Sequence, residues 1–209
     1  MTQLTKQAYE ANPKAYWDAP RLEMEEIKKG LNGRPLDSSN PLWVKYILPE
    51  LAPNAGHSLC LDLGCGGGRY IIATADFFDK VIGIDFSASN LEIARELARI
   101  NGIEKIEFYH ADLADIRGIP DASADFAYSV AVFMHMPNET KRRALRELCK
   151  VLKPDGCAVL IETVPIDSGA FDCPDIGQWP WQDMIRDAGL KIEGIDPAEP
   201  FTKYKLRRG

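Results

Sequence analysis

The sequence lacks most features of exported, metal-binding and membrane-inserted proteins. It has five cysteines in 209 residues and no C-x-x-C pair, so we expect neither a disulfide framework nor a zinc site. No apolar run approaches the ~20 residues that a membrane-spanning helix needs. Residues 1–6 show neither a secretory apolar core nor an Arg-rich transit pattern. We therefore expect a cytoplasmic location, no membrane partner and no bound metal.

Basic residues are also in deficit. The chain has 25 Lys and Arg against 31 Asp and Glu, which gives a formal net charge of −6. Binding to nucleic acid depends on phosphate contacts from a basic surface, so nucleic acid is not favoured as the main partner. The length and the 45% hydrophobic content fit one ordinary globular domain with at most a small appendage. The composition leaves the oligomeric state open.

The order of helical and strand patterns predicts the fold class. Up to residue 51 the patterns are helical, and Trp43, Ile47 and Leu51 recur at helical spacing. Short apolar strands then alternate with helices. The strands are expected at 58–63, 80–84, 105–109, 125–130 and 157–162, and the helices at 69–78, at 87–101 and from an Asn138 cap onward. Such alternation predicts an α/β domain with a doubly wound, mostly parallel sheet.

The end of the chain breaks this alternation. A helical pattern at 179–188 precedes two strand patterns at 190–195 and 201–207. The gap between these two strands is too short for a crossover helix, so they are expected to pair as an antiparallel hairpin. The whole prediction is a seven-stranded sheet (residues 40–209) preceded by an N-terminal helical cap or lid (residues 1–39).

A glycine-rich turn after the first strand is the strongest functional signal. Residues 61–68 read L-D-L-G-C-G-G-G. Glycine permits a tight turn and a close approach of ligand to backbone, and the N–H groups at a helix start can hold a polar group. The dinucleotide fingerprint would need glycine at position 69, where Arg69 stands, and the G-K-[ST] of a phosphate loop is absent. The turn therefore predicts a ligand site of another kind at the carboxyl ends of the strands.

Acidic residues follow the next two strands. Asp85 stands about 20 residues beyond the glycines, where a carboxylate can accept hydrogen bonds from a ribose diol, and Phe86 offers an apolar face for a base. After the third strand, Asp112 can accept from an exocyclic amine while Leu113 packs against a ring. Together these residues predict a site for a ribose and its base.

In this order and spacing, the pieces resemble the class I, seven-stranded S-adenosylmethionine-dependent methyltransferases, especially their small-molecule branch, over roughly residues 40–207. The resemblance implies that the glycine turn holds the methionine part of S-adenosylmethionine and that the fourth strand ends beneath it. The family has Phe-Asp entering this strand, whereas this chain has Asp125-Phe126, which we interpret as a swap at the strand edge. The implied cofactor residues are Asp62, Gly64, Cys65, Gly66, Gly68, Asp85, Phe86, Asp112, Leu113, Ser129 and Val130.

The resemblance also implies the reaction, which is transfer of a methyl group to an O, N, S or C atom of a substrate. The D/N-P-P-Y/F signature of amino-directed DNA methylation is missing, because residues 129–132 read S-V-A-V; this disfavours a flipped base as substrate. No large insertion follows the fifth strand, so a small metabolite is favoured. Two alternatives stay open: a cofactor-binding regulator or partner subunit without turnover, and an aminopropyl transferase on the same scaffold.

Candidates for contact with the substrate are fewer. His135 follows the fourth strand near the place where the acceptor atom must meet the methyl group, and imidazole has a suitable pKa for a proton acceptor. It is the catalytic candidate, although a histidine at this position can instead hydrogen-bond the backbone. Tyr16 and Trp17 form either a lid over the cofactor or a helix packed on the sheet. The candidate substrate contacts are Tyr16, Trp17, Phe133 and Trp179.

Overall fold

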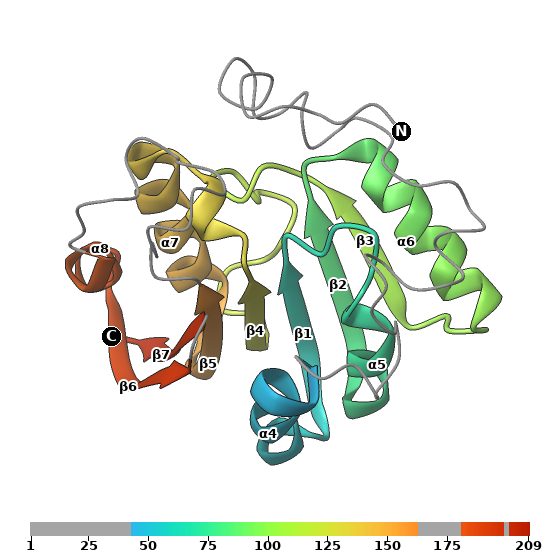
Figure 1. Cartoon of the computed structure of the whole chain (residues 1–209), viewed down its shortest axis with the longest axis horizontal. Helices are drawn as coiled ribbons and strands as arrows, with labels where there is room; N and C mark the ends of the chain where they lie inside the picture. Colours follow the sequence, from blue (N-terminus) through green and yellow to red (C-terminus); the bar gives the residue numbers. More distant parts are fainter. Residues whose placement is uncertain (1–42, 163–180, 199–200) are drawn as a thin grey trace.

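The computed structural model describes residues 43–162, 181–198 and 201–209, and these residues form one seven-stranded sheet flanked by helices (Figure 1). The strands lie in the order β3-β2-β1-β4-β5-β7-β6. The first five are parallel, and β7 is antiparallel to both of its neighbours. The predicted doubly wound sheet with a C-terminal antiparallel hairpin is confirmed. The strands are β1 (His57–Leu63), β2 (Phe78–Asp85), β3 (Ile106–His110), β4 (Ala124–Val130), β5 (Leu152–Glu162), β6 (Leu190–Ala198) and β7 (Phe201–Arg208).

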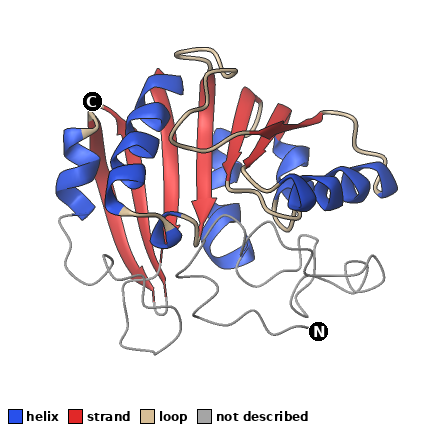
Figure 2. Cartoon of the chain, turned by 90° about the horizontal axis from the view of Figure 1, so that it is seen from above, coloured by secondary structure: helices blue, strands red, loops and turns tan. Residues whose placement is uncertain are grey.

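Helices cover both faces of this sheet, which Figure 2 shows from above. The described helical segments begin with a π-helical turn, and none of them is long and apolar enough to cross a membrane. The proposed cap at residues 1–39 lies outside the described residues. The helical segments are η2 (Trp43–Ile47), α4 (Leu48–Leu51), η3 (Ala52–Asn54), α5 (Ile71–Thr74), η4 (Ala75–Phe77), α6 (Ala88–Ile100), η5 (Phe133–His135), α7 (Asn138–Val151) and α8 (Trp181–Asp187).

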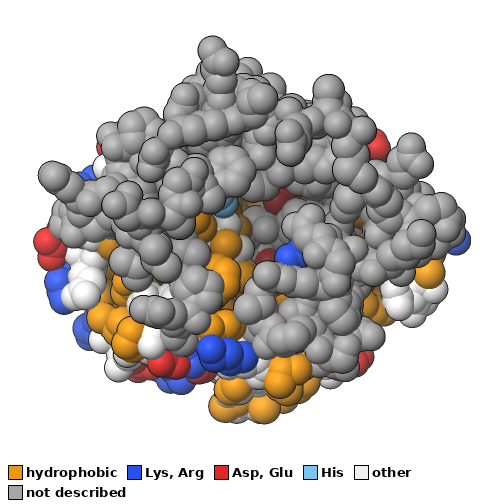
Figure 3. All heavy atoms as spheres, in the orientation of Figure 1, with side chains coloured by type: hydrophobic (Ala, Val, Ile, Leu, Met, Phe, Trp, Pro, Cys, Tyr) orange, Lys and Arg blue, Asp and Glu red, His pale blue; other side chains and the backbone are white. Residues whose placement is uncertain are grey.

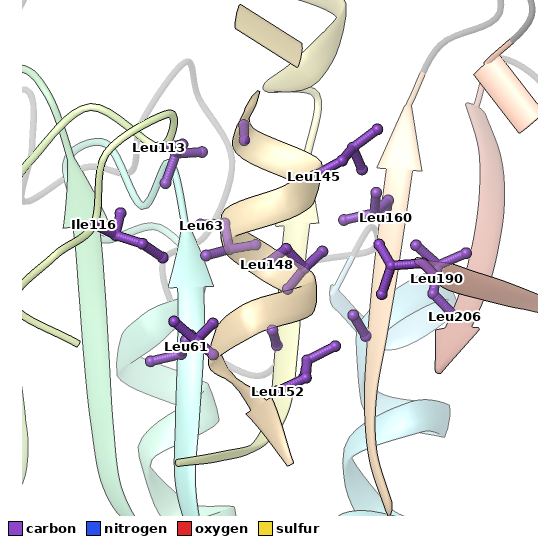
Figure 4. Packing of buried hydrophobic residues seen from close by; sticks show 14 of the residues in the cluster. Leu61, Leu63, Leu113, Ile116, Leu145, Leu148, Leu152, Leu160, Leu190 and Leu206 are labelled. Atoms are coloured by element: carbon purple, nitrogen blue, oxygen red, sulfur yellow. The ribbon is translucent and has the colours of Figure 1, made fainter. Parts of the chain in front are cut away.

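Two apolar clusters hold the layers together, one on each face. Because side chains alternate along a strand, Leu61 and Leu63 of β1 pack toward α7 and α8, whereas Cys60 packs on the opposite face with α4 and α5. Leu145 and Leu148 of α7 lie across the strands of the first cluster (Figure 4). The central strands are therefore covered on both faces, and a ligand is expected at the carboxyl ends of the parallel strands.

Several element boundaries differ from those predicted. The glycine turn extends through Tyr70, so the following helix begins at Ile71 and gives way to strand at Phe78. Asn138 is the first residue of α7 rather than its cap, and Pro137 takes the cap position without a side-chain hydrogen bond. The fifth strand was expected to begin at residue 157, but β5 begins at Leu152, and its pairing with β4 shifts register between Ala124 and Phe126.

This register shift explains the Asp125-Phe126 order. Phe126 pairs with Cys60 and Cys157, and its ring stacks on Phe78 at 5.9 Å inside the core. The Asp125 carboxylate instead accepts hydrogen bonds from the backbone N–H of Leu59 and from Lys153 Nζ, at 2.9 and 2.6 Å. The aromatic ring thus fills the core while the carboxylate joins the edges of β1, β4 and β5.

Candidate cofactor and active site

The glycine turn lies where β1 ends and packs closely against the segment that follows β4. Gly64 has φ +76, and a Cβ placed there would lie 2.6 Å from both methyl groups of Val132. Gly66 has φ +51, and a Cβ there would meet nothing within 4 Å. One glycine is therefore required by close packing, whereas the other borders open space from which a ligand can approach the backbone.

Asp85 joins this turn to the end of β2. Its Oδ2 accepts a hydrogen bond from the Gly66 N–H at 2.8 Å, and its Oδ1 accepts one from the Ser87 N–H, also at 2.8 Å. The side chain is 8% exposed. The structure thus brings together two predicted cofactor residues that are 19 positions apart in the sequence.

Asp62 lies below the turn, 3% exposed, and accepts a 2.7 Å hydrogen bond from the Tyr128 hydroxyl. Thr74 Oγ1 of α5 lies 3.1 Å from the same hydroxyl, which completes a buried chain from α5 to the turn. Burial raises the pKa of Asp62 to about 7; the Tyr128 hydrogen bond lowers it and the nearby charge of Asp85 raises it. Two carboxyl groups therefore lie close together at the carboxyl ends of β1 and β2.

The end of β3 contributes the next residues. His110 Nε2 lies 2.9 Å from the backbone oxygen of Phe86, and the N–H of Ala111 donates to the Asp85 carbonyl at 3.0 Å. Asp112 Oδ1 accepts from the Ala114 N–H at 3.0 Å. Leu113 is buried in the cluster under α7. The backbone after β3 is therefore fixed to the end of β2, and Phe86 lies between them.

The end of β4 leads into the predicted acceptor side. Ser129 is buried, and its Oγ lies 3.5 Å from Glu162 Oε1. Val130 is half-buried, and the chain then turns at Ala131, which has φ +54. Half-buried His135 ends the short η5 helix, and its N–H donates to the Val132 carbonyl at 3.0 Å. Cys65, within the glycine turn, is buried, and burial raises the pKa of its thiol.

Glu162, at the end of β5, is a buried carboxylate that the sequence reasoning missed. Burial raises its pKa to about 7, although the N–H groups of residues 132–134 and the charge of buried Lys141 lower it. It stands at the carboxyl end of a central strand, so the rule that identified Asp85 applies to it as well. Tyr128 and Thr74 were also missed, because nothing in a sequence shows which hydroxyl in a strand or helix faces a buried carboxylate.

The remaining substrate candidates are only partly placed. Phe133 is 1% exposed and its ring makes an edge contact with Trp181 at 5.6 Å, while Trp181 contacts Tyr204 in the same way at 6.0 Å. Tyr16, Trp17 and Trp179 lie outside the described residues. Within the described ranges, no group of three or more His, Cys, Asp or Glu side chains could hold a metal ion.

The ends of the strands together carry the groups that we expect to bind S-adenosylmethionine. The Asp85 carboxylate ends β2, the backbone turn has open space beside Gly66, and apolar Phe86 and Leu113 follow β2 and β3. Figure 3 shows the molecule in the orientation of Figure 1. Between the parts drawn in grey, it shows apolar side chains with a histidine and acidic groups beside them. The arrangement fits a ligand with a polar end, a diol and a base.

Comparison with known proteins identifies the same kind of domain. Residues 60–156 match the family described as "Methyltransferase domain". The chain is 31% identical over 157 residues to "O-methyltransferase cnsE" of Penicillium expansum, an alignment that covers 68% of this chain and 55% of the relative. The chain spans little more than half the length of the curated relatives that it matches first.

Solved structures share the fold at low sequence identity. A S-adenosylmethionine-dependent methyltransferase from Aquifex aeolicus superposes with a TM-score of 0.67 at 18% identity, over 90% of this chain and 100% of that chain. The [4+2]-cyclase SpnF superposes with a TM-score of 0.63 at 20% identity, over 77% of this chain and 79% of that chain. The matched methyltransferase domain, the seven-stranded sheet and the glycine turn all indicate the same family. The chain therefore belongs to the class I S-adenosylmethionine-dependent methyltransferases.

Proposed function

We propose that this protein transfers a methyl group from S-adenosylmethionine to a nucleophilic O, N, S or C atom of a small metabolite. The main observation in support is the 2.8 Å hydrogen bond that the Gly66 N–H donates to the Asp85 carboxylate. It sets a diol acceptor beside a backbone turn that is open to a ligand. The name of the O-methyltransferase from Penicillium expansum supports transfer to an oxygen atom.

Each part of the cofactor has candidate residues in the described site. Asp85 would hold the ribose hydroxyls, and Phe86 would line the adenine slot with Asp112 and Leu113 at its far end. The polar methionine end would lie on the turn above Asp62, with the end of β4 beneath it. The turn residues are Gly64, Cys65, Gly66 and Gly68, and the β4 residues are Ser129 and Val130.

When bound, the cofactor supplies an electrophilic methyl group on a sulfonium, which is a good leaving group. The protein then has to align the acceptor with that methyl group and exclude water. The Asp85 carboxylate favours a cationic ligand at this edge of the sheet. Where the acceptor must lose a proton, His135 is the candidate that would take it.

The acceptor side would be completed by parts of the chain outside the described residues. Tyr16, Trp17 and Trp179 are proposed substrate contacts, together with Phe133, and residues 1–39 are proposed as a separate cap or lid. We also propose a cytoplasmic location, and we propose no nucleic-acid partner, because the net charge is −6.

The fold by itself serves more than one chemistry, since the cyclase SpnF shares it. The experiment therefore separates binding from turnover. A ligand that binds only the folded state at 100 times its Kd adds ~2.7 kcal/mol of stability, which is roughly 5–10 °C in Tm for a domain of this size. We expect that shift with S-adenosylhomocysteine and none with NAD or ATP.

Turnover is then measured as transfer of labelled methyl from S-adenosylmethionine to a panel of small phenols, amines, thiols and carboxylic acids. Label in any acceptor establishes the reaction. Binding of S-adenosylhomocysteine without transfer to any acceptor would favour a regulator or partner subunit. Transfer from decarboxylated S-adenosylmethionine to a polyamine would instead favour aminopropyl transfer.

A further inference from the structure

Four consecutive backbone N–H groups after β4 are held by the last two residues of β5. The N–H of Ala131 donates to the Ile161 carbonyl at 2.7 Å. The N–H groups of the next three residues all donate to the Glu162 carboxylate: residues 132 and 133 to Oε1 at 3.3 and 3.2 Å, and residue 134 to Oε2 at 3.0 Å. One side chain thus fixes the whole start of η5.

Both oxygens of the Glu162 carboxylate accept hydrogen bonds from the backbone of residues 132–134. Glu162 is 5% exposed, and both of its oxygens accept from the protein, with Ser129 Oγ as a further neighbour of Oε1 at 3.5 Å. Hydrogen bonds from several N–H groups to one ionised carboxylate are stronger than bonds between neutral groups. The described partners of the Glu162 carboxylate are therefore groups of the protein itself, and we assign it no contact with a substrate.

The fixed segment contacts the cofactor turn directly. Its corner residue, Ala131, adopts φ +54, a conformation that is costly for a residue with a Cβ and that persists only where the surroundings impose it. The next residue, Val132, presents both methyl groups to Gly64, so closely that a Cβ there would lie only 2.6 Å away. A shift of this segment would therefore move the Val132 side chain, against which Gly64 of the turn is packed.

We propose that Glu162 is a positioning residue, whose carboxylate holds residues 132–134 against the glycine turn and so sets the position of the turn that receives the cofactor. This inference rests on the function proposed above. Glu162, at the end of β5, would thus influence the reaction without touching the substrate. Its hydrogen bonds hold the backbone of residues 132–134, and Val132 in turn packs against Gly64.

The test uses Glu162→Gln and Glu162→Ala in the full chain, with S-adenosylhomocysteine as the probe. A glutamine keeps the volume but places an NH₂ group where one carboxylate oxygen accepted, so at least one N–H of residues 132–134 loses its acceptor. Loss of one bond to a charged acceptor corresponds to roughly tenfold or more in a local equilibrium. We expect the amide exchange of residues 132–134 to accelerate by at least that factor, measured residue by residue by NMR.

Affinity for S-adenosylhomocysteine should fall in the order wild type, Glu162→Gln, Glu162→Ala, because the graded loss of acceptors releases the segment step by step. The matched control is Glu50→Gln, which removes a carboxylate that bonds Lys203 of β7 and lies away from η5. It should leave both the exchange at 132–134 and the affinity unchanged. The glutamine variant decides the question even if the alanine variant does not fold.

Two results would overturn the proposal. One is wild-type affinity in Glu162→Gln despite faster exchange at 132–134, which would show that the position of this segment does not matter to the cofactor. The other is faster exchange throughout β1 and β4 to the same extent, which would show a merely structural role. Failure of the proposed function looks different, because the wild type itself would then either not bind S-adenosylhomocysteine or bind the cofactor without transferring methyl to any acceptor.

Discussion

The hydroxyl of Tyr128 donates a 2.7 Å hydrogen bond to the Asp62 carboxylate, between residues that are register partners on the neighbouring parallel strands β1 and β4. The pair lies on the face of the sheet that α5 covers, where Thr74 Oγ1 approaches the same hydroxyl to 3.1 Å. A buried carboxyl group under the cofactor turn is thus held by a strand that is not adjacent to β1 in sequence. The hydrogen bonding of the Asp62 carboxyl group therefore depends on the pairing of β1 with β4, and not on the glycine motif alone.

Replacing Tyr128 with phenylalanine should destabilise the protein. The variant removes the donor and leaves the Asp62 carboxyl without that partner in the interior, which costs ~1–3 kcal/mol. Urea unfolding at pH 7 measures the loss. Tyr109→Phe removes a hydroxyl from β3, two strands away from Asp62, and is the control. Equal stability of Tyr128→Phe and wild type would show that the hydrogen bond contributes nothing.

The raised pKa of Asp62 predicts a pH dependence of stability. The folded chain keeps this proton up to about pH 7, whereas the unfolded chain releases it near 3.8. Between these values the unfolded state binds fewer protons, so the Asp62 contribution is fully present below pH 3.8 and is lost as the pH rises through 7. Glu162 acts in the same direction, since its pKa is raised from 4.5 to about 7.

Asp62→Asn isolates the Asp62 part, because asparagine can still accept from Tyr128 but does not titrate. Its free energy of unfolding should fall less between pH 5 and pH 7 than that of wild type. The difference in slope should amount to about 1–3 kcal/mol over this range. Urea unfolding of both proteins at pH 5, 6 and 7 measures it. Parallel curves would mean that Asp62 is already ionised in the folded protein at pH 5.

Asp85→Ala should weaken S-adenosylhomocysteine binding strongly while the protein stays folded. The variant removes the proposed acceptor of both ribose hydroxyls, and each hydrogen bond to a charged group is worth ~1.5–3 kcal/mol. We therefore expect a loss of about a hundredfold or more in affinity by calorimetry. Asp79→Asn, an exposed carboxylate on the same strand, is the control. Unchanged affinity in Asp85→Ala would remove the ribose assignment.

Gly64→Ala should destabilise the turn for two separable reasons. The residue has φ +76, and its new Cβ would lie 2.6 Å from the Val132 methyl groups. Gly102→Ala shares the positive φ, at +66, but its Cβ would meet nothing within 4 Å, so it measures the backbone strain alone. We expect Gly64→Ala to lose roughly 1–3 kcal/mol more than Gly102→Ala, as overpacking does.

Val132→Ala should recover part of that loss when it is combined with Gly64→Ala, because it removes the methyl groups that collide. Thermal melts of both single variants and the double variant give the coupling between the two positions. Strict additivity would contradict the contact between the turn and the segment after β4.

The main features of the fold could be predicted from the sequence because they rest on local patterns. The alternation of short apolar strands with amphipathic helices indicates a parallel sheet, and the short gap after residue 195 indicates the final hairpin. The residue-level boundaries were less accurate around residues 70, 138 and 153. At these places the outcome depends on the length of the glycine turn, on Pro137 and on an irregular pairing of β4 with β5.

The sequence by itself determined the positions of the glycines and of the carboxylate at the end of β2, because the tight turn and the strand end are local. Only the tertiary structure decided which distant groups meet them. Strand β4 lies beside β1 and brings Tyr128 to Asp62, and β5 lies beside β4 and brings Glu162 to residues 132–134. Such partners are set by the order of strands in the sheet, and no local pattern encodes that order.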